Sequence, residues 1–499
     1  MLETNSYRIN SASFTEPIGK KDHLAKPYPG GGYDFLLINV NSTFQQGLIP
    51  DGEEPPWGLV RVADVARKTY GINAGILDSH RLKLMPEEIK RQLELIRPKI
   101  VGLNPTSVNI AEAQSIAAIC DFLGIPVILG GVHATLNPAI ARRDFPESKA
   151  IIRGNGEIVT GLLVKGLLDG NEPPLKGVYY ENDDYSRVDF APKMSANDLP
   201  VINQDELIDK PLFRHKVTIG GKPKVINEAT LYISQGCPFE CSFCASPVMN
   251  DRGNPFTKPY DRPNSSRVIE QIQNCIDLGA DAIHFLDDMA FTLQRHIQEL
   301  YYGLAEKQLL GKFIWRGLTR VPVVNHLDEQ TMKMLAETGI WKIALGIESG
   351  NNDILKRINK GITRDEAFRA VYKLGSEGIQ VKGFFIMGFP GETESQIIQT
   401  QQFIYLLREV GLTDLAIFQF KPYPGTKEYD FLAKEKPEAL LELSYLRQSQ
   451  TGLKGKAQFR IEQHDSWLPD ELTISEIPSG KVREYVMQTI SEFYGKEIA

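Results

Sequence analysis

The sequence predicts an α/β protein with two α/β domains in succession along the chain. Three observations support this fold class. Short apolar runs alternate with amphipathic stretches over residues 33–170 and again over 229–430, which is the pattern of parallel strands joined by helices. The apolar runs are continuous, as in strands that are covered on both faces. Finally, 499 residues with 42% hydrophobic and 24% charged residues are enough for several globular domains.

Composition narrows the functional class. A net charge of −7 disfavours nucleic acid as the main partner. No apolar run is long enough for a membrane span, and residues 1–32, a polar extension rich in Gly and Pro, carry no basic-then-apolar leader. Five cysteines in so long a chain do not make a disulfide scaffold, so a reducing cytoplasm is expected. Cys120 and Cys275 lie among helix-spaced apolar residues and are expected to be buried core thiols.

The stretch 33–170 is expected to be a doubly wound open sheet of Rossmann type. The expected strands are 35–40, 74–78, 100–104, 126–129 and 150–152, and the expected helices are 57–70, 86–96 and 111–123. A ligand of such a sheet lies beyond the carboxyl ends of the strands, near the point where the strand order reverses. No GxGxxG follows the first strand, so a dinucleotide is a weak candidate.

Residues 229–430 are expected to form six strand–helix units. The expected strands are 229–234, 282–288, 313–318, 342–348, 381–387 and 415–420. Six units are too few for a closed eight-stranded barrel, so we expect an open, partial (β/α)6 TIM barrel with its chemistry at the carboxyl ends of the strands. Residues 171–228 are expected to connect the two domains. Residues 431–499 are expected to form a small, mainly helical region that caps the barrel mouth.

Three of the five cysteines follow the first barrel strand with CxxxCxxC spacing. They are Cys237, Cys241 and Cys244. Thiolates are soft ligands that favour iron–sulfur clusters, zinc or copper. Three thiolates on one loop can hold three irons of a cubane and leave the fourth without a protein ligand, and an open coordination position is typical of a catalytic metal site. Structural zinc and chance clustering remain alternatives, although His215 and His284 do not stand at zinc-finger spacing.

This loop resembles that of the radical S-adenosylmethionine (SAM) superfamily, because it carries CxxxCxxC with the aromatic Phe243 before the last cysteine and follows a first barrel strand. The resemblance implies a 4Fe–4S cluster on the three cysteines, with SAM chelated to the free iron. It also implies reductive cleavage of SAM to a 5′-deoxyadenosyl radical. A one-electron reductant such as flavodoxin or ferredoxin is the partner that this chemistry implies.

The resemblance also implies how the methionine part of SAM is held. Asp287 and Asp288 stand at the position of the motif for the amino group, although the sequence there is Asp-Asp-Met rather than Gly-Gly-Glu. Arg320, with Arg316 as second choice, is expected to bind the methionine carboxylate in bidentate fashion. The alternative for each arginine is a structural or surface ion pair.

Two further strand ends are expected to bind the nucleoside part. Glu348, followed by Ser349, ends a buried strand, where a carboxylate needs hydrogen-bond donors. Ribose hydroxyls would supply them, and a structural ion pair is the alternative. Gly388 and Pro390 are expected to let the backbone approach the nucleoside closely, although a structural turn would also explain them.

The first domain is similar to the cobalamin-binding domain that precedes many radical SAM domains. The residues implied as cobalamin-binding are Asn39, Trp57, Gly58, Thr106, Ser107, Gly130, Gly131, His133, Gly154 and Glu157. Small residues at the end of the fourth strand would admit a bulky nucleotide tail. The Asp-Ser-His sequence at 78–80 is similar to the DxHxxG motif whose histidine binds cobalt in other cobalamin enzymes. However, it follows the second strand instead of the first, so no histidine ligand to cobalt is expected. His133 is expected to contact the corrin or its tail. A Rossmann-like module without ligand is the alternative.

Together these resemblances imply a cobalamin-dependent radical SAM enzyme that methylates an unactivated carbon of a small-molecule metabolite. One alternative is a related enzyme that cyclises, oxidises or rearranges its substrate. A tRNA methylthiotransferase is disfavoured, because the amino-terminal half has only Cys120 where that family needs a second cluster. A cobalamin or light sensor without enzymatic activity is the remaining alternative.

Overall fold

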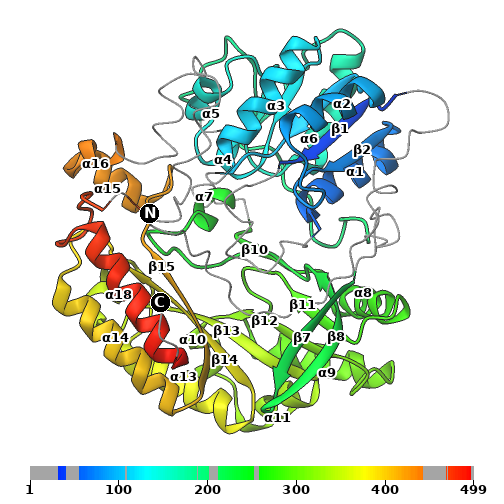
Figure 1. Ribbon diagram of the computed structural model, residues 1–499. Helices are drawn as coiled ribbons and strands as arrows, with labels where there is room; N and C mark the ends of the chain where they lie inside the picture. The colour runs from blue at the N-terminus through cyan, green and yellow to red at the C-terminus, as the bar shows by residue number, and fades with distance from the viewer. Residues whose placement is uncertain are drawn as a thin grey trace, which may run out of the picture.

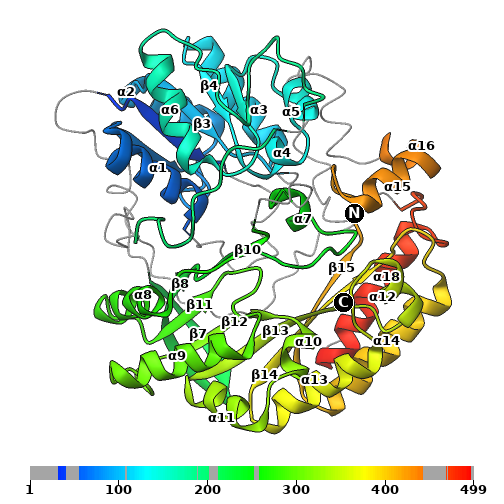
Figure 2. The ribbon, with the colours of Figure 1, turned by 180° about the vertical axis from the view of Figure 1, so that it is seen from behind.

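The computed structural model describes residues 32–40, 55–106, 109–187, 189–201, 212–251, 258–441, 468 and 470–495. Two α/β domains lie one above the other, with the first domain (blue to cyan) over the larger barrel domain (green to orange) in both views (Figures 1 and 2). Ser107 and nearly all of the extension 1–32 lie outside the described residues. No helix among the described residues is long and apolar enough to cross a membrane.

The first domain is the doubly wound sheet that the sequence predicts. The strand order is β2-β1-β3-β4-β5-β6. The strands are β1 (Phe35–Asn39), β2 (Ala74–Asp78), β3 (Ile100–Leu103), β4 (Val127–Leu129), β5 (Ala150–Ile152) and β6 (Val178–Tyr179). All pairs are parallel except the pair of β5 and β6. The order reverses between β1 and β3, which places the ligand crevice of such a sheet beyond their carboxyl ends.

Helices cover both faces of this sheet. One face packs against α1 (Trp57–Tyr70) and α6 (Gly156–Leu168), and the other against α2 (Pro86–Ile96) and α3 (Ile110–Phe122). Two short helices, α4 (Gly131–Leu136) and α5 (Pro138–Asp144), follow β4. Because both faces are buried, the strands consist almost wholly of aliphatic and aromatic residues.

The second domain is the predicted partial barrel. Its sheet has the order β15-β14-β13-β12-β11-β8-β7. The strands are β7 (Phe213–Ile219), β8 (Lys222–Leu231), β11 (Ala282–Phe285), β12 (Ile314–Thr319), β13 (Ile340–Glu348), β14 (Gln380–Met387) and β15 (Leu412–Gln419). Six of these strands are parallel, and β7 pairs antiparallel with β8. The sequence assigned 213–228 to a connector, because this polar hairpin has no continuous apolar run.

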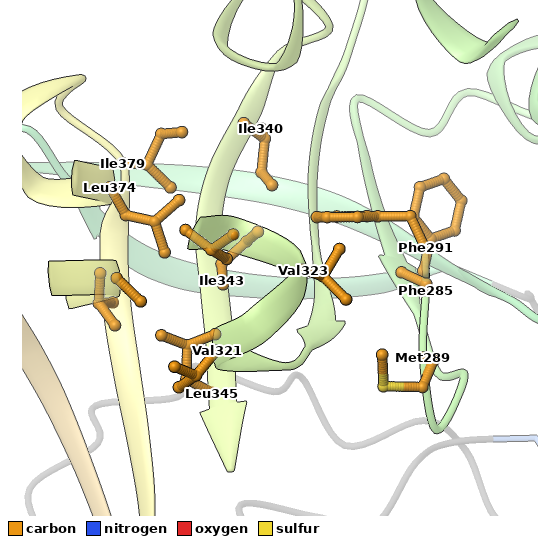
Figure 3. Close-up of a cluster of buried hydrophobic side chains, with 14 of the residues drawn as sticks. Phe285, Met289, Phe291, Val321, Val323, Ile340, Ile343, Leu345, Leu374 and Ile379 are labelled. Atoms are coloured by element: carbon orange, nitrogen blue, oxygen red, sulfur yellow. The ribbon is translucent and has the colours of Figure 1, made fainter. Parts of the chain in front are cut away.

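Helices line the outer wall of the barrel. They are α8 (Ser265–Asp277), α9 (Gln294–Glu306), α10 (Val321–Asn325), α11 (Glu329–Glu337), α12 (Asn352–Arg357), α13 (Arg364–Ser376) and α14 (Glu394–Glu409). Figure 3 shows part of the core that they share with the sheet, where Val321 and Val323 of α10 lie near Ile343 and Leu345 of β13. This apolar wall fixes the strand ends that carry the polar residues.

The carboxyl-terminal helix corrects one prediction. Helix α18 (Ser479–Tyr494) packs beside α14 on the outer wall, against β15, and does not cap the barrel mouth (Figure 1, red). Nε2 of Gln401 donates to Oγ1 of Thr489 over 3.1 Å, and the hydroxyl of Tyr494 accepts from the backbone N–H of Leu415 over 2.9 Å. Helices α15 (Lys427–Glu435) and α16 (Pro437–Leu441) follow β15, and residues 442–467 lie outside the described chain.

Two contacts join the domains near the start of the barrel. The indole N–H of Trp57 donates to Oγ1 of Thr230 on β8 over 2.9 Å, and the guanidinium of Arg61 lies 5.3 Å from the ring centre of Tyr232. In addition, α4 of the first domain contacts α7 (Ser246–Met249), which directly follows the cysteine loop. The carboxyl edge of the first sheet therefore faces the cysteine loop.

Candidate active site between the two domains

The cysteine loop leaves β9 (Gln235–Gly236) at the carboxyl end of the first barrel strand, and its three thiols are partly buried. The backbone N–H of Ser242 donates to the carbonyl of Ile358 over 2.9 Å, and its hydroxyl donates to Oε1 of Glu428 over 2.6 Å. Nδ2 of Asn359 donates to the carbonyl of Glu240 over 2.8 Å. The loop is thus bound to a segment that follows α12, which fixes the orientation of the cysteines.

Burial raises the pKa of the Cys244 thiol to about 12 and also raises the pKa of Cys237. A bound metal replaces these protons, since cysteine binds metal as the thiolate. Among the residues that the structure describes, no three His, Cys, Asp or Glu side chains are grouped as ligands of one metal ion. A cubane makes a different demand, because each thiolate binds its own iron.

The two predicted aspartates have different environments. Asp287 is buried and accepts hydrogen bonds from the backbone N–H of Ile233 over 3.0 Å and the hydroxyl of Ser234 over 2.6 Å, and burial raises its pKa to about 6. It therefore secures the end of the first barrel strand. Asp288 is exposed and accepts from the hydroxyl of Ser246 over 2.9 Å, directly beside the cysteine loop. Of the two, Asp288 is the side chain placed to receive an ammonium group.

Arg320 lies at the carboxyl end of β12, where it precedes α10. Its guanidinium is 3.8 Å from the ring centre of Phe239 in the cysteine loop, and Nη2 donates to the carbonyl of Lys360. The side chain is 4% exposed, yet Nε has no hydrogen-bond partner in the described structure. A buried guanidinium with an unused donor beside the cysteine loop matches the predicted carboxylate ligand.

The second-choice prediction, Arg316, is wrong. Nε and Nη2 of Arg316 each donate to the carboxylate of Glu228 over 2.7 Å, and His215 approaches the same carboxylate at 3.2 Å. Burial opposes ionisation of Glu228, but these hydrogen bonds outweigh it and hold its pKa at about 2. Arg316 lies within β12, whereas Arg320 follows its last residue, so Arg316 is farther from the carboxyl end of the barrel.

Glu348 ends β13 with φ at +72°, a conformation that is strained for a residue with a side chain. Nζ of Lys360 donates to Oε1 of Glu348 over 2.7 Å, and both side chains are buried. A Cβ atom at Gly346 would lie 2.6 Å from that same oxygen, so a larger residue there would displace the carboxylate. The structural ion pair, an alternative from sequence, is therefore present, and it fixes the carboxylate at the strand end. Ser349 binds Thr400 across 3.1 Å and closes the turn.

The structural alternative accounts for Gly388. It has φ at +89°, its N–H donates to Oε2 of Glu392 over 2.6 Å, and a Cβ there would lie 3.1 Å from Val482 of α18. Pro390 is buried in the same turn, and burial raises the pKa of Glu392 to about 7. The aromatic residue predicted from the cysteine motif, Phe243, lies nearby.

Phe243 meets Phe389 of that turn edge to face, with the ring centres 5.6 Å apart. The cysteine loop, β13 and the turn after β14 are thus in contact around one end of the barrel, as the sequence predicts for a SAM site.

In the first domain, several predicted residues bind their own neighbours. Nδ2 of Asn39 donates to Asp78 over 2.7 Å, and the N–H of Thr106 donates to Oδ1 of Asn109 over 2.7 Å. Trp57 forms the contact with Thr230 already described. These side chains shape the crevice edge and the domain junction, and a direct contact of each with cobalamin stays a prediction.

The prediction for His133 needs correction. Nε2 of His133 lies 3.0 Å from Oδ2 of Asp144, so this buried ring joins α4 to α5 and does not offer that nitrogen to a corrin. Gly154, with φ at +98°, bridges to Ala191, because the backbones approach closely there. Gly58 is exposed and no atom lies within 4 Å of a Cβ placed on it, so its contact with cobalamin stays a prediction.

The end of β4 matches a ligand-binding edge. A Cβ on Gly130 would meet no atom within 4 Å, whereas one on Gly131, with φ at +79°, would lie 3.0 Å from Asn104. Oδ1 of Asn104 is buried and has no hydrogen-bond partner in the described chain. Oε2 of Glu157, at the start of α6, is also buried and has no hydrogen-bond partner in the described chain. Buried polar atoms are nearly always satisfied in native proteins, so these two oxygens are suited to accept hydrogen bonds from a ligand or water.

Two residues that sequence reasoning missed face the domain junction. Gln235, 9% exposed, lines a cavity with Trp57 and Arg61, and both polar atoms of its amide are buried without a partner in the described structure. Nζ of Lys193 is likewise buried and unbonded there, and burial lowers its pKa. No local sequence signal marks either residue, since Lys193 lies in the expected connector and Gln235 precedes the cysteine motif.

Comparison with known proteins agrees with this geometry. The profile of the radical SAM superfamily matches residues 231–404. The uncharacterized methyltransferase PH0819 of Pyrococcus horikoshii is 30% identical over 388 residues, which cover 76% of this chain and 78% of the relative. The cytidylyl-2-hydroxyethylphosphonate methyltransferase of Streptomyces wedmorensis is 24% identical over 460 residues, or 81% of this chain and 82% of that protein. The chain therefore belongs to the radical SAM superfamily and is an enzyme.

Its fold places it more closely. The radical SAM methyltransferase TsrM from Kitasatospora setae, solved with cobalamin and a [4Fe-4S] cluster, superposes with a TM-score of 0.59 at 17% identity, over 80% of this chain and 78% of that one. The cobalamin-dependent radical SAM enzyme OxsB, solved with aqua-cobalamin and SAM, gives a TM-score of 0.60 at 16% identity, over 81% of this chain and 55% of OxsB. The chain has the two-domain fold of the cobalamin-dependent radical SAM enzymes.

Proposed function

We propose that this protein is a cobalamin-dependent radical SAM methyltransferase that methylates an unactivated carbon of a small molecule. The observation that carries the proposal is the position of the cysteine loop. It stands at the carboxyl end of the barrel, beside Asp288 and the buried Arg320. It also faces the carboxyl edge of a doubly wound domain, whose α4 contacts α7.

Within this proposal the side chains have distinct tasks. Cys237, Cys241 and Cys244 hold the 4Fe–4S cluster. Arg320 and Asp288 bind the carboxylate and ammonium of the methionine part of SAM, and Glu348 accepts from its ribose. The cofactors supply the radical and methyl-transfer chemistry, and the protein supplies orientation and exclusion of water.

Cobalamin would lie at the crevice of the first domain. Gly130 offers open space at the end of β4, and Asn104 and Glu157 offer buried polar atoms that lack a protein partner in the described structure. These features fit a large ligand with many amide groups. Binding between the domains would bring it over the cysteine loop and enclose the substrate between the two cofactors.

Three of the relatives are named as methyltransferases, which favours methyl transfer. A second candidate is cyclisation without methyl transfer. It is favoured by the anaerobic magnesium-protoporphyrin IX monomethyl ester cyclases of Rubrivivax gelatinosus and Cereibacter sphaeroides, which are 24% and 26% identical to this chain. We propose a small-molecule substrate, a flavodoxin or ferredoxin as electron donor, and the reducing cytoplasm as the location, in keeping with five cysteines that form no disulfide.

The test is anaerobic turnover with SAM that carries a deuterated methyl group. The protein is reconstituted with iron, sulfide and cobalamin, reduced, and incubated with candidate metabolites from the genomic neighbourhood. A product that gains the deuterated methyl group, together with 5′-deoxyadenosine, supports the proposal. 5′-Deoxyadenosine with a product that lacks the label supports the cyclase instead. Absence of 5′-deoxyadenosine from reconstituted protein refutes both.

A further inference from the structure

The segment Arg357–Lys360, here called the 357–360 strap, lies between the cysteine loop and the predicted SAM-binding side chains. On one side it binds the loop, because the carbonyl of Ile358 accepts from Ser242 over 2.9 Å and Asn359 donates to the carbonyl of Glu240 over 2.8 Å. These two bonds join residues more than a hundred positions apart in sequence. The strap thus fixes the backbone that carries the cysteines.

On its other side the strap binds two different strand ends through one residue. Nζ of Lys360 donates to Oε1 of Glu348 over 2.7 Å, and the carbonyl of Lys360 accepts from Nη2 of Arg320. The Lys360 ammonium also lies 6.0 Å from the ring centre of Phe243 in the cysteine loop. Lys360 therefore touches the end of β13, the end of β12 and the surroundings of the cysteine loop at once.

Burial and strain indicate that this arrangement is specific. Lys360 is 5% exposed, and buried lysines are rare unless they are paired. Asn359 adopts φ at +53° and Glu348 φ at +72°, both in the left-handed region that side chains disfavour. A Cβ at Gly346 on β13 would lie 2.8 Å from Nζ of Lys360, so a larger residue there would displace the ammonium. Asparagine tolerates this region after a helix, so the strain lies at Glu348, whose carboxylate binds the buried ammonium of Lys360.

We infer that Lys360 is a positioning residue for SAM, which aligns Glu348 with the ribose and Arg320 with the methionine carboxylate relative to the cysteine loop. This inference rests on the proposed function, since it concerns the same SAM site. It differs from the binding roles of Glu348 and Arg320, because Lys360 acts through both of them. Loss of its ammonium leaves a buried carboxylate without its partner and frees the end of β13.

The test measures SAM affinity in protein with a reconstituted cluster. K360M is expected to raise the SAM Kd about tenfold or more, with iron content and cobalamin affinity unchanged, and K360R is expected to recover most of the loss. The matched control is K342M. Lys342 lies on β13, the strand that Glu348 ends, and pairs with Asp414 over 2.9 Å at the far end of the barrel. K342M is expected to leave the SAM Kd unchanged.

A double-mutant cycle separates positioning from an independent role. E348Q/K360M contains no buried unpaired charge and stays measurable even where K360M unfolds. If Lys360 acts through Glu348, the double variant binds SAM within about twofold of E348Q alone. Additive losses in the cycle, or wild-type SAM affinity in K360M, would overturn the inference. Failure of the wild-type protein to bind SAM would instead refute the proposed function, and the role of Lys360 would fall with it.

Discussion

Replacement of Arg316 by methionine tests whether Arg316 has a structural role and Arg320, just after β12, a role in SAM binding. The structure assigns Arg316 to Glu228 and leaves Arg320 for SAM, so R316M is expected to lose stability and keep its affinity for SAM. Glu228 is 2% exposed, and its pKa falls from 4.5 to about 2 in the folded protein. At about 1.4 kcal/mol for each pKa unit, the ionised carboxylate contributes about 3 kcal/mol near neutral pH. Because His215 provides part of this stabilisation, we expect R316M to lower the free energy of unfolding by about 2 to 3 kcal/mol.

The stability difference between wild type and R316M is expected to depend on pH. A carboxyl group with a lowered folded pKa stabilises the native state above its unfolded pKa, and that stability is lost as the pH falls. The gap between wild type and R316M is therefore expected to be full at pH 7. It narrows as the pH falls through 4.5 toward 2. Denaturant unfolding of cluster-free protein at a series of pH values measures it.

A surface pair provides the control. Lys333 and Glu329 are 3.0 Å apart but mostly exposed, so K333M is expected to leave stability nearly unchanged at any pH in this range. SAM affinity is measured separately on cluster-loaded protein. An R316M variant with wild-type stability and weakened SAM binding would refute the assignment of Arg316 to Glu228.

Three more predictions follow from the same geometry. Replacement of Cys237, Cys241 or Cys244 by alanine is expected to abolish iron binding and 5′-deoxyadenosine formation. The controls C120A and C275A alter buried core thiols and are expected to keep both. Iron retention in any of the first three variants would contradict the cluster assignment. D288N is expected to raise the SAM Kd with little change in melting temperature. D287N is expected to lower the melting temperature, because it disturbs the hydrogen bonds to Ile233 and Ser234. The reverse pattern would make Asp287 the SAM ligand and Asp288 the structural residue. W57F removes the hydrogen bond to Thr230 and is expected to lower the free energy of unfolding by about 1 kcal/mol. T230V is expected to give a similar loss, and the two losses are not expected to add in the double variant. Additive losses would show that the two side chains act independently.

The sequence alone was enough for the fold class and for the metal-binding loop. Strand–helix alternation is a local property, since each continuous apolar run reports a strand that is buried on both faces. The spacing of Cys237, Cys241 and Cys244 is local as well, because three ligands within eight residues lie on one loop in any fold. The hairpin of β7 and the early part of β8 escaped prediction, because its polar, half-exposed strands lack such runs.

The tertiary structure decided which polar side chains meet at the site. The sequence left both Arg320 and Arg316 as candidates for the methionine carboxylate, but Arg316 reaches Glu228, whereas Arg320 reaches the cysteine loop and Lys360. Sequence also placed α18 over the mouth, whereas its apolar face is buried against β15 on the outer wall. These outcomes depend on pairings between residues far apart in the chain, and no periodicity within one element encodes such pairings. Local patterns therefore determined the elements and the cysteine ligands, and long-range packing determined the partner of each charge.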